Sequence, residues 1–343
     1  MLLTVAWDED AGSLKLIDQT KLPSRLVYKN CKDYREVADA IKRLVVRGAP
    51  AIGVAAAFGL ALAARQSAAK TKDDFIADMS TAFELLRSTR PTAVNLFWAL
   101  ERVMDKAKKS KSVEQAKSDV LNEALVMANE DIESNRSLGS HGARMFTDGD
   151  VVLTHCNAGS LATVAYGTAL GVIRSARESG KRLSVVATET RPVMQGARLT
   201  AFELQHDGVD VSLIPDTAVG HMMSRGIIQR VIVGADRVLR TGHVFNKIGT
   251  YQVAILARKH QIPFYVAAPL STFDFESNPE DVVIEERSID EVVKVGKKRI
   301  APRGVRIFNP AFDMTPPELI SGIITERGIL NPPFEKNLKT LLG

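Results

Sequence analysis

The sequence contains few cysteines and lacks the common cofactor motifs, and both absences exclude classes of protein. Its two cysteines, Cys31 and Cys156, lie far apart in 343 residues, so they form neither a disulfide framework nor a zinc spacing. A reducing cytoplasm is the expected location. No G-x-x-x-x-G-K-[ST] loop, no G-x-G-x-x-G after an expected strand and no cluster with metal-ligand spacing is present. We therefore expect chemistry that uses side chains alone, without a metal or cofactor.

Aromatic residues are also scarce, at 6% of the chain, and the net charge is only +5. The basic runs Lys106–Lys111 and Lys297–Arg299 contain no interleaved aromatic residues of the kind that stack on bases, so we expect exposed helix faces and no nucleic-acid partner. The mild positive charge suits a small anionic substrate. The apolar run Ala49–Ala64 is shorter than the roughly 20 residues that span a membrane. It predicts a buried helix and no membrane partner.

The two parts of the chain differ in pattern. Alternating residues predict a small hairpin or meander over 1–30, and helical spacing follows at 31–46, Ala49–Ala64, Phe75–Leu86, Val94–Lys108 and Val113–Met145. Further on, helical stretches alternate with short β-branched runs at Val151–Thr154, Leu183–Ala187, Val209–Ile214, Val231–Val233, Phe264–Ala267 and Val305–Ile307. This alternation predicts a doubly wound parallel sheet. Ligands bind outside the carboxyl ends of such strands, so the residues there are the candidate site.

Cys156 follows the first of these runs, within the segment His155–Ser160. We expect a helix over Leu161–Arg174, which places the thiol near a helix amino terminus, where a cysteine pKa is lowered. The backbone N–H groups of 158–160 are then available to a phosphate. The alternative is a small buried apolar residue, the usual role of a free cysteine.

Three other strand ends carry polar residues. Asp236 follows Val231–Val233 and reads equally well as an active-site acid or a helix cap. The segment 246–250 opens a helix with a lysine and a glycine, which suits either an anion or a solvated helix start. Residues 188–192, with Gln195 behind them, are typical of sugar or phosphate contacts or of a structural ion pair.

Several longer blocks make a family resemblance clear: IDQT (17–20), VVRGAPAIG (45–53), TRPTAVNL (89–96), HCNAGSLAT (155–163), ETRPVMQGARLT (189–200), VGADRV (233–238) and NKIGTYQVA (246–254). The chain resembles the methylthioribose-1-phosphate isomerases, which belong with the regulatory subunits of translation initiation factor 2B. The resemblance implies a mostly helical amino-terminal domain with a short β region, over 1–125, followed by a Rossmann-like domain over 126–343. It also implies a homodimer.

The resemblance also assigns roles to residues of the matching blocks. Cys156 and Asp236 correspond to the family's catalytic pair. Substrate contacts are implied for Arg47, Gly48, Ala49, Arg90, Gln195, Asn246 and Lys247. The implied substrate is a phosphorylated sugar, 5-methylthioribose 1-phosphate. Relatives acting on ribose 1,5-bisphosphate or 5-deoxyribose 1-phosphate, and non-enzymatic regulatory subunits, are the alternatives.

Overall fold

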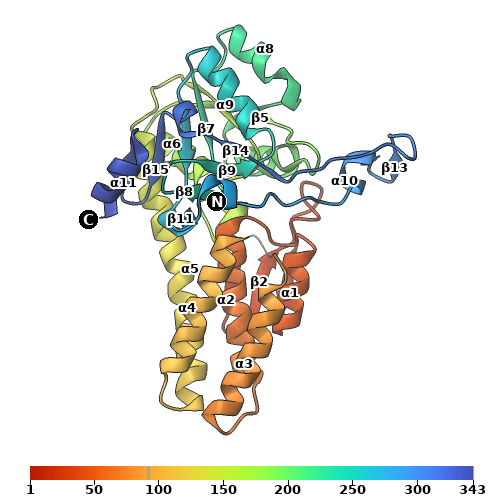
Figure 1. Ribbon diagram of the computed structural model, residues 1–343, viewed down its shortest axis with the longest axis vertical. Helices are drawn as coiled ribbons and strands as arrows, with labels where there is room; N and C mark the ends of the chain where they lie inside the picture. Colours follow the sequence, from red (N-terminus) through yellow and green to blue (C-terminus); the bar gives the residue numbers. More distant parts are fainter. Residues whose placement is uncertain (91–92, 343) are drawn as a thin grey trace.

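The computed structural model describes residues 1–90 and 93–342, so Pro91 and Thr92 of the 89–96 block lie outside the described residues. The chain begins with a three-stranded antiparallel sheet of β1 (Val5–Asp8), β2 (Ser13–Ile17) and β3 (Tyr28–Cys31). Helices follow: α1 (Tyr34–Lys42), α2 (Ala49–Gln66), α3 (Lys72–Arg87), α4 (Val94–Lys109) and α5 (Val113–Ala143). They form the elongated lower part of Figure 1.

Helix α2 is the centre of this helical part. It is long and apolar enough to cross a membrane, yet 83% of it is buried inside the protein. Its small residues let neighbouring helices approach closely, because a Cβ on Gly53 would lie 2.8 Å from the carbonyl oxygen of Asn95 in α4. The expected buried helix is confirmed. Its first turn points toward the second part of the molecule.

The second part is built on a seven-stranded sheet with the order β16-β15-β10-β7-β4-β5-β6. Its strands are β4 (Val151–Thr154), β5 (Ser184–Thr188), β6 (Asp210–Ile214), β7 (Arg230–Val233), β10 (Phe264–Ala267), β15 (Gly322–Thr325) and β16 (Gly328–Leu330). All pairings are parallel except β15 with β16. The helices of this part are α6 (Ala169–Glu178), α7 (Ala201–His206), α8 (Val219–Ser224), α9 (Thr250–Lys259) and α11 (Phe334–Leu342). The predicted α/β class is confirmed.

A smaller sheet and an arm complete this part. The sheet has the order β11-β8-β9-β14, with β11 (Phe273–Asp274), β8 (Arg237–Leu239), β9 (Val244–Lys247) and β14 (Phe312–Thr315). The arm, residues 282–310, includes α10 (Asp290–Val293), β12 (Lys294–Val295) and β13 (Lys298–Arg299), and it projects from the molecule in Figure 1.

Three local predictions are wrong. Val305–Ile307 is not a strand, since Val305 is 51% exposed on the arm and the buried segment Gly322–Thr325 forms the next strand of the sheet. The expected helix at 161–174 begins only at Ala169, after one 3₁₀ turn at Ser160–Ala162. The basic run at 297–299 belongs to the exposed hairpin of the arm rather than to a helix.

The predicted domain division at 125/126 falls inside α5. The first half of this helix, including Val120 and Ala124, packs in the core of the helical part, whereas Leu138 and Ala143 pack against the sheet. One helix therefore serves both cores, and the division stays a prediction.

Candidate active site

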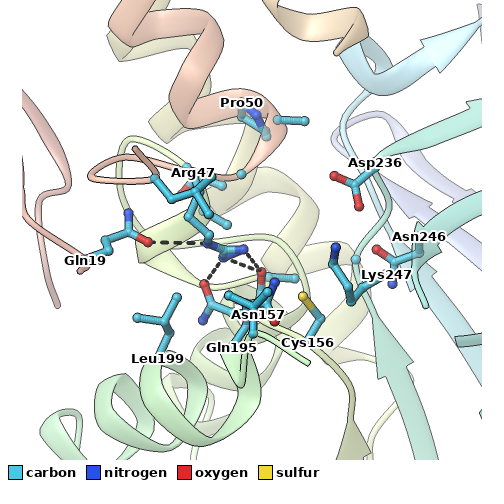
Figure 2. A pocket seen from close by; sticks show the side chains of 18 of the residues that line it. Gln19, Arg47, Pro50, Cys156, Asn157, Gln195, Leu199, Asp236, Asn246 and Lys247 are labelled. Carbon is cyan, nitrogen blue, oxygen red and sulfur yellow. Dashed lines mark hydrogen bonds between the residues drawn. The ribbon is translucent and has the colours of Figure 1, made fainter. Parts of the chain in front are cut away.

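A cavity of about 230 Å³ lies at the carboxyl edge of the large sheet, under the first turn of α2. Cys156 follows β4 and Asp236 follows β7, and these strands are neighbours. Figure 2 shows both side chains around the same cavity, with Arg47 across from Lys247. The two expected reactive groups lie at the same cavity because they follow neighbouring strands of the sheet.

Every residue to which the family resemblance assigns a role lines this cavity. They are Arg47, Gly48, Ala49, Arg90, Cys156, Gln195, Asp236, Asn246 and Lys247.

The backbone at Cys156 is held in an unusual conformation. Its φ is +64°, in the left-handed region that residues other than glycine rarely adopt. Its N–H donates to Thr190 Oγ1 at 2.9 Å, and its carbonyl accepts from Thr200 Oγ1 at 2.6 Å. Such strain persists only where the surroundings hold it, and it is concentrated at functional sites.

His155 ties the Cys156 segment to the Lys247 segment. Its Nδ1 lies 2.7 Å from Thr188 Oγ1 and its Nε2 2.9 Å from the carbonyl oxygen of Ile248. Burial lowers the pKa of the imidazole, so the neutral ring is favoured. A Cβ at Gly249 would come within 3.0 Å of this ring, so glycine permits the close approach.

A buried carboxylate, Glu203, fixes the segment after Cys156. It is fully buried and accepts from Asn157 Nδ2 at 2.5 Å and from both Ser160 N at 2.8 Å and Ser160 Oγ at 2.7 Å. Arg174 donates to it at 2.7 Å. The expectation that the N–H groups of 158–160 are available to a phosphate is thus wrong for Ser160, whose N–H donates to Glu203. A lone glutamate in a helix gave no sequence signal for this role.

Arg47 reaches the same segment from the helical part. Its guanidinium donates to the carbonyl oxygen of Asn157 at 2.8 and 3.1 Å, to the Asn157 side-chain oxygen, and to Gln19 Oε1 at 3.4 Å. Gly48 follows with φ +94°, and a Cβ there would lie 2.4 Å from the carbonyl oxygen of Ala162. The two parts of the molecule therefore meet closely at the cavity.

The small sheet positions Lys247. Its Nζ donates to the carbonyl oxygen of Ala311 at 2.9 Å and lies 4.5 Å from the centroid of the Phe312 ring. The N–H groups that open α9, on Gly249 and Tyr251, donate to Asp313 at 2.6 and 3.1 Å. Burial raises the pKa of Asp313 to about 6. The helix start is therefore capped by a carboxyl group of the protein, and the lysine side chain remains for a ligand.

Burial moves three groups of the cavity toward their neutral forms. It raises the pKa of Asp236, against the opposing effects of Lys247, Arg90 and Arg47. It also raises the pKa of the Cys156 thiol and lowers that of Lys247. The expectation of a lowered cysteine pKa is wrong because the thiol is buried and the α-helix begins only at Ala169.

Some residues that line the cavity were not predicted individually from the sequence as part of the site. Among them are Arg198, Leu199, Arg287 and Phe312. Arg198 donates to the carbonyl oxygen of Gln19 at 2.8 Å, which joins the first β region to the site. Arg198 lies in the π-helical turn Gly196–Thr200, a feature often found at functional sites. Among the described residues, no group of three or more His, Cys, Asp or Glu side chains could hold a metal ion.

Together these features define an α/β protein with a Rossmann-like sheet and a cationic pocket that contains a buried carboxyl group and a buried thiol. The chain belongs to the initiation factor 2 subunit family, whose model matches residues 45–332.

Three relatives place it more finely. A methylthioribose-1-phosphate isomerase from Thermosipho africanus is 56% identical over 340 residues, 99% of this chain and 98% of the relative. The crystal structure of 5-methylthioribose 1-phosphate isomerase from Pyrococcus horikoshii is 47% identical, with a TM-score of 0.93, and the match covers 100% of this chain and 96% of that one. The crystal structure of translation initiation factor eIF-2B subunit delta from Archaeoglobus fulgidus is 53% identical, with a TM-score of 0.90, over 100% and 99% of the two chains.

Proposed function

We propose that this protein is an aldose–ketose isomerase that converts 5-methylthioribose 1-phosphate into 5-methylthioribulose 1-phosphate in methionine salvage. The observation that carries the proposal is the pairing of Asp236 and Cys156 at neighbouring strand ends in one cationic cavity. The similarity to two isomerases over nearly the whole chain supports it.

The substrate poses a particular chemical problem, because phosphate on the anomeric oxygen prevents ordinary ring opening. A proton must reach the ring oxygen as the bond from C1 to that oxygen breaks. Asp236 is the proposed acid, since burial raises its pKa and so favours the protonated carboxyl group. The bonding electrons pass to the ring oxygen, which becomes the C4 hydroxyl.

Hydrogen must then move from C2 to C1. In one route the Cys156 thiolate removes the C2 proton, an enol phosphate forms, and the thiol returns the proton to C1. In the other route the hydrogen moves with its electron pair directly from C2 to C1. In both, the proton of the C2 hydroxyl passes to the Asp236 carboxylate, which restores the acid.

The raised pKa of Cys156 favours the second route, with a neutral thiol beside C2. Reaction in D₂O separates the two routes. A direct shift leaves C1 of the product without deuterium, whereas proton transfer through the thiol introduces it.

Several groups are proposed to hold the C1 phosphate and the sugar hydroxyls. Arg47 and Lys247 supply positive charge from opposite sides of the cavity (Figure 2). The first turn of α2 adds N–H groups, since its cap residue Gly48 offers no side-chain acceptor. Gln195, whose Oε1 is buried without a hydrogen-bond partner, is a candidate contact for a sugar hydroxyl. Ala49, Arg90 and Asn246 complete the set.

A homodimer in the cytoplasm is the proposed working form. Light scattering coupled to gel filtration tests the dimer directly, with a mass of twice the 37.4 kDa chain as the expected result.

The test of the function is proton NMR of the protein with 5-methylthioribose 1-phosphate, and in parallel with 5-deoxyribose 1-phosphate and ribose 1,5-bisphosphate. The expected result is loss of the anomeric signal and growth of the ketose mainly with the first substrate, and both about 10²–10⁴-fold slower with the Asp236→Asn variant. Turnover of none of the three by the unmodified protein would refute the isomerase.

A regulatory role is the second candidate, because the Archaeoglobus fulgidus structure is that of an initiation factor subunit. Binding of a sugar phosphate without conversion would favour it. The buried acid and thiol on adjoining strands favour the enzyme instead.

A further inference from the structure

A second cavity, of about 300 Å³, lies beside the active site where the helical part meets the sheet. We call it the lateral cavity. Helices α2, α4 and α5 form one side of it, and the segment 269–271 after β10 and the turn between β15 and β16 form the other. Pro50, which Figure 2 labels, and Pro269 line both this cavity and the active-site cavity.

The charged lining of the lateral cavity is acidic. Glu130, Asp131 and Glu326 line it, and none of the described lining residues is basic. Glu130 is paired with Arg102, whose Nη2 donates to it at 3.0 Å. Within residues 1–90 and 93–342, no Lys or Arg nitrogen lies within 4.0 Å of the other two carboxylates. Two carboxylates therefore lack a cation here, although the chain carries a net charge of +5.

Backbone N–H groups hold these two carboxylates. The N–H of Val164 donates to Asp131 Oδ2 at 2.7 Å, and that of Leu270 donates to the two oxygens of Glu326 at 3.0 and 3.2 Å. Burial nevertheless raises the pKa of Asp131 to about 7. The N–H dipoles therefore do not replace a full positive charge, and an ammonium group in the cavity would favour the ionised carboxylate.

A buried amide points to a ligand independently of the carboxylates. Asn95, at the start of α4, lines the cavity and is 2% exposed. Its Nδ2 donates to Ser271 Oγ at 3.2 Å, whereas its Oδ1 is buried without a hydrogen-bond partner among the described residues. A buried acceptor without a donor is costly, so a ligand that brings an N–H group would stabilise it.

The arrangement of the acidic groups suits an organic amine better than a metal ion. Within residues 1–90 and 93–342, no three His, Cys, Asp or Glu side chains lie close enough together to hold a metal ion. Apolar side chains supply much of the remaining wall, from Pro50, Val54, Met127 and Leu270. Methylene groups gain from contact with such a wall. A short methylene chain with an ammonium group at each end matches both the apolar wall and the separated carboxylates.

We propose that the lateral cavity binds a small alkyl diamine, whose ammonium groups pair with Asp131 and Glu326 and donate to Asn95 Oδ1. This site does not depend on the reaction at the neighbouring cavity. Because its walls come from both parts of the molecule, it is complete only in the folded protein. A bound diamine should therefore also raise Tm, since a ligand that binds only the native state stabilises it.

Isothermal titration calorimetry of the whole chain with 1,4-diaminobutane tests the site. The control ligand is 1,4-butanediol, which has the same carbon chain and no charge. Asp131→Asn and Glu326→Gln each remove one carboxylate charge and keep the size of the side chain. Glu133→Gln is the matched control variant, because Glu133 is exposed on the same helix as Asp131 and does not line the cavity. Circular dichroism checks that each variant is folded.

The expected result is saturable binding of one 1,4-diaminobutane per chain, with a rise in Tm, and no binding of the diol. Asp131→Asn and Glu326→Gln should each weaken binding about 10-fold or more, because a hydrogen bond to a charged group is lost, and Glu133→Gln should leave it unchanged. No saturable binding by the unmodified protein would overturn the site. Equal binding of the diol would do the same, as would equal affinities in all three variants, which would indicate association with the surface. Displacement of the diamine by an equal concentration of Mg²⁺ would make this an inorganic cation site instead.

Discussion

Removal of the Arg174 guanidinium should destabilise the protein far more than an ordinary ion-pair mutation. Arg174 lies in α6 with its side chain 6% exposed, and it bridges Glu203 at 2.7 Å and Asp207 at 2.6 Å. Arg174→Met keeps much of the side-chain volume but leaves Glu203 as a fully buried carboxylate without its cation. Breaking a buried pair in this way costs about 3–5 kcal/mol of unfolding free energy.

That cost converts into a lowering of Tm. The unfolding entropy is about 2.1 cal/mol/K per residue, so in a chain of 343 residues each kcal/mol lowers Tm by about 1.4 °C and the expected shift is roughly 4–7 °C. Arg182→Met is the control, because Arg182 pairs with Asp148 at 2.6 Å but is 87% exposed. An exposed pair contributes only about 0–1 kcal/mol.

Urea unfolding followed by circular dichroism measures both variants, and Arg174→Met/Glu203→Gln completes the comparison. Neutralising Glu203 removes the unpaired charge, so the double variant should be more stable than Arg174→Met alone. A loss in Arg174→Met no larger than in Arg182→Met would refute the argument. So would a double variant that is less stable than the single one by the full cost of Glu203→Gln.

Three further predictions concern the cavity. Asp236→Asn should lower kcat by about 10²–10⁴-fold, the usual contribution of a general acid. Because the pKa of Asp236 is raised, the activity of the unmodified protein should fall as the pH rises through that pKa. The stability that depends on the protonated carboxyl group should be lost in the same direction. A pH–rate profile with no alkaline limb assignable to this group would contradict its role. Cys156→Ser should lose most activity, and bound substrate should slow alkylation of the thiol, measured by mass spectrometry; equal alkylation rates with and without substrate would remove Cys156 from the site. Gly196→Ala should misfold or lose activity, since the added Cβ would lie 1.7 Å from the carbonyl oxygen of Thr188, and soluble protein with unchanged kcat would show that the backbone relaxes.

Much of the architecture follows from local sequence pattern. The strands Val151–Thr154 and Phe264–Ala267 have the predicted bounds because each is a short apolar run flanked by breaks in the pattern. Val305–Ile307 has the same local composition but lies on the exposed arm. Whether Val305–Ile307 is buried depends on the path of the arm, and the tertiary fold sets that path rather than the local composition of the run.

That the candidate site residues lie close together was also predictable from the sequence pattern. In a parallel sheet, residues that follow neighbouring strands must meet, and Cys156 and Asp236 do so. Glu203 and Phe312 lie in elements whose approach to the cavity depends on packing. The family resemblance supplied Arg47 and Arg90, which come from the helical part and which no strand-end rule would find.

The raised pKa of the Cys156 thiol, where a lowered one was expected, shows how the helical part affects the chemistry of the site. A strand-end cysteine beside an open helix start would be an exposed, ionised nucleophile. Here α2 and Arg47 close over the sheet, and burial dominates the pKa of Cys156 despite the positive charges nearby. The same enclosure raises the pKa of Asp236 and lowers that of Lys247. A phosphate dianion that enters this site raises the pKa of Asp236 further and opposes the lowering of the pKa of Lys247, because negative charge favours bound protons. The substrate therefore keeps the acid protonated and promotes the charged form of the lysine that faces its phosphate, so binding itself prepares the site for ring opening.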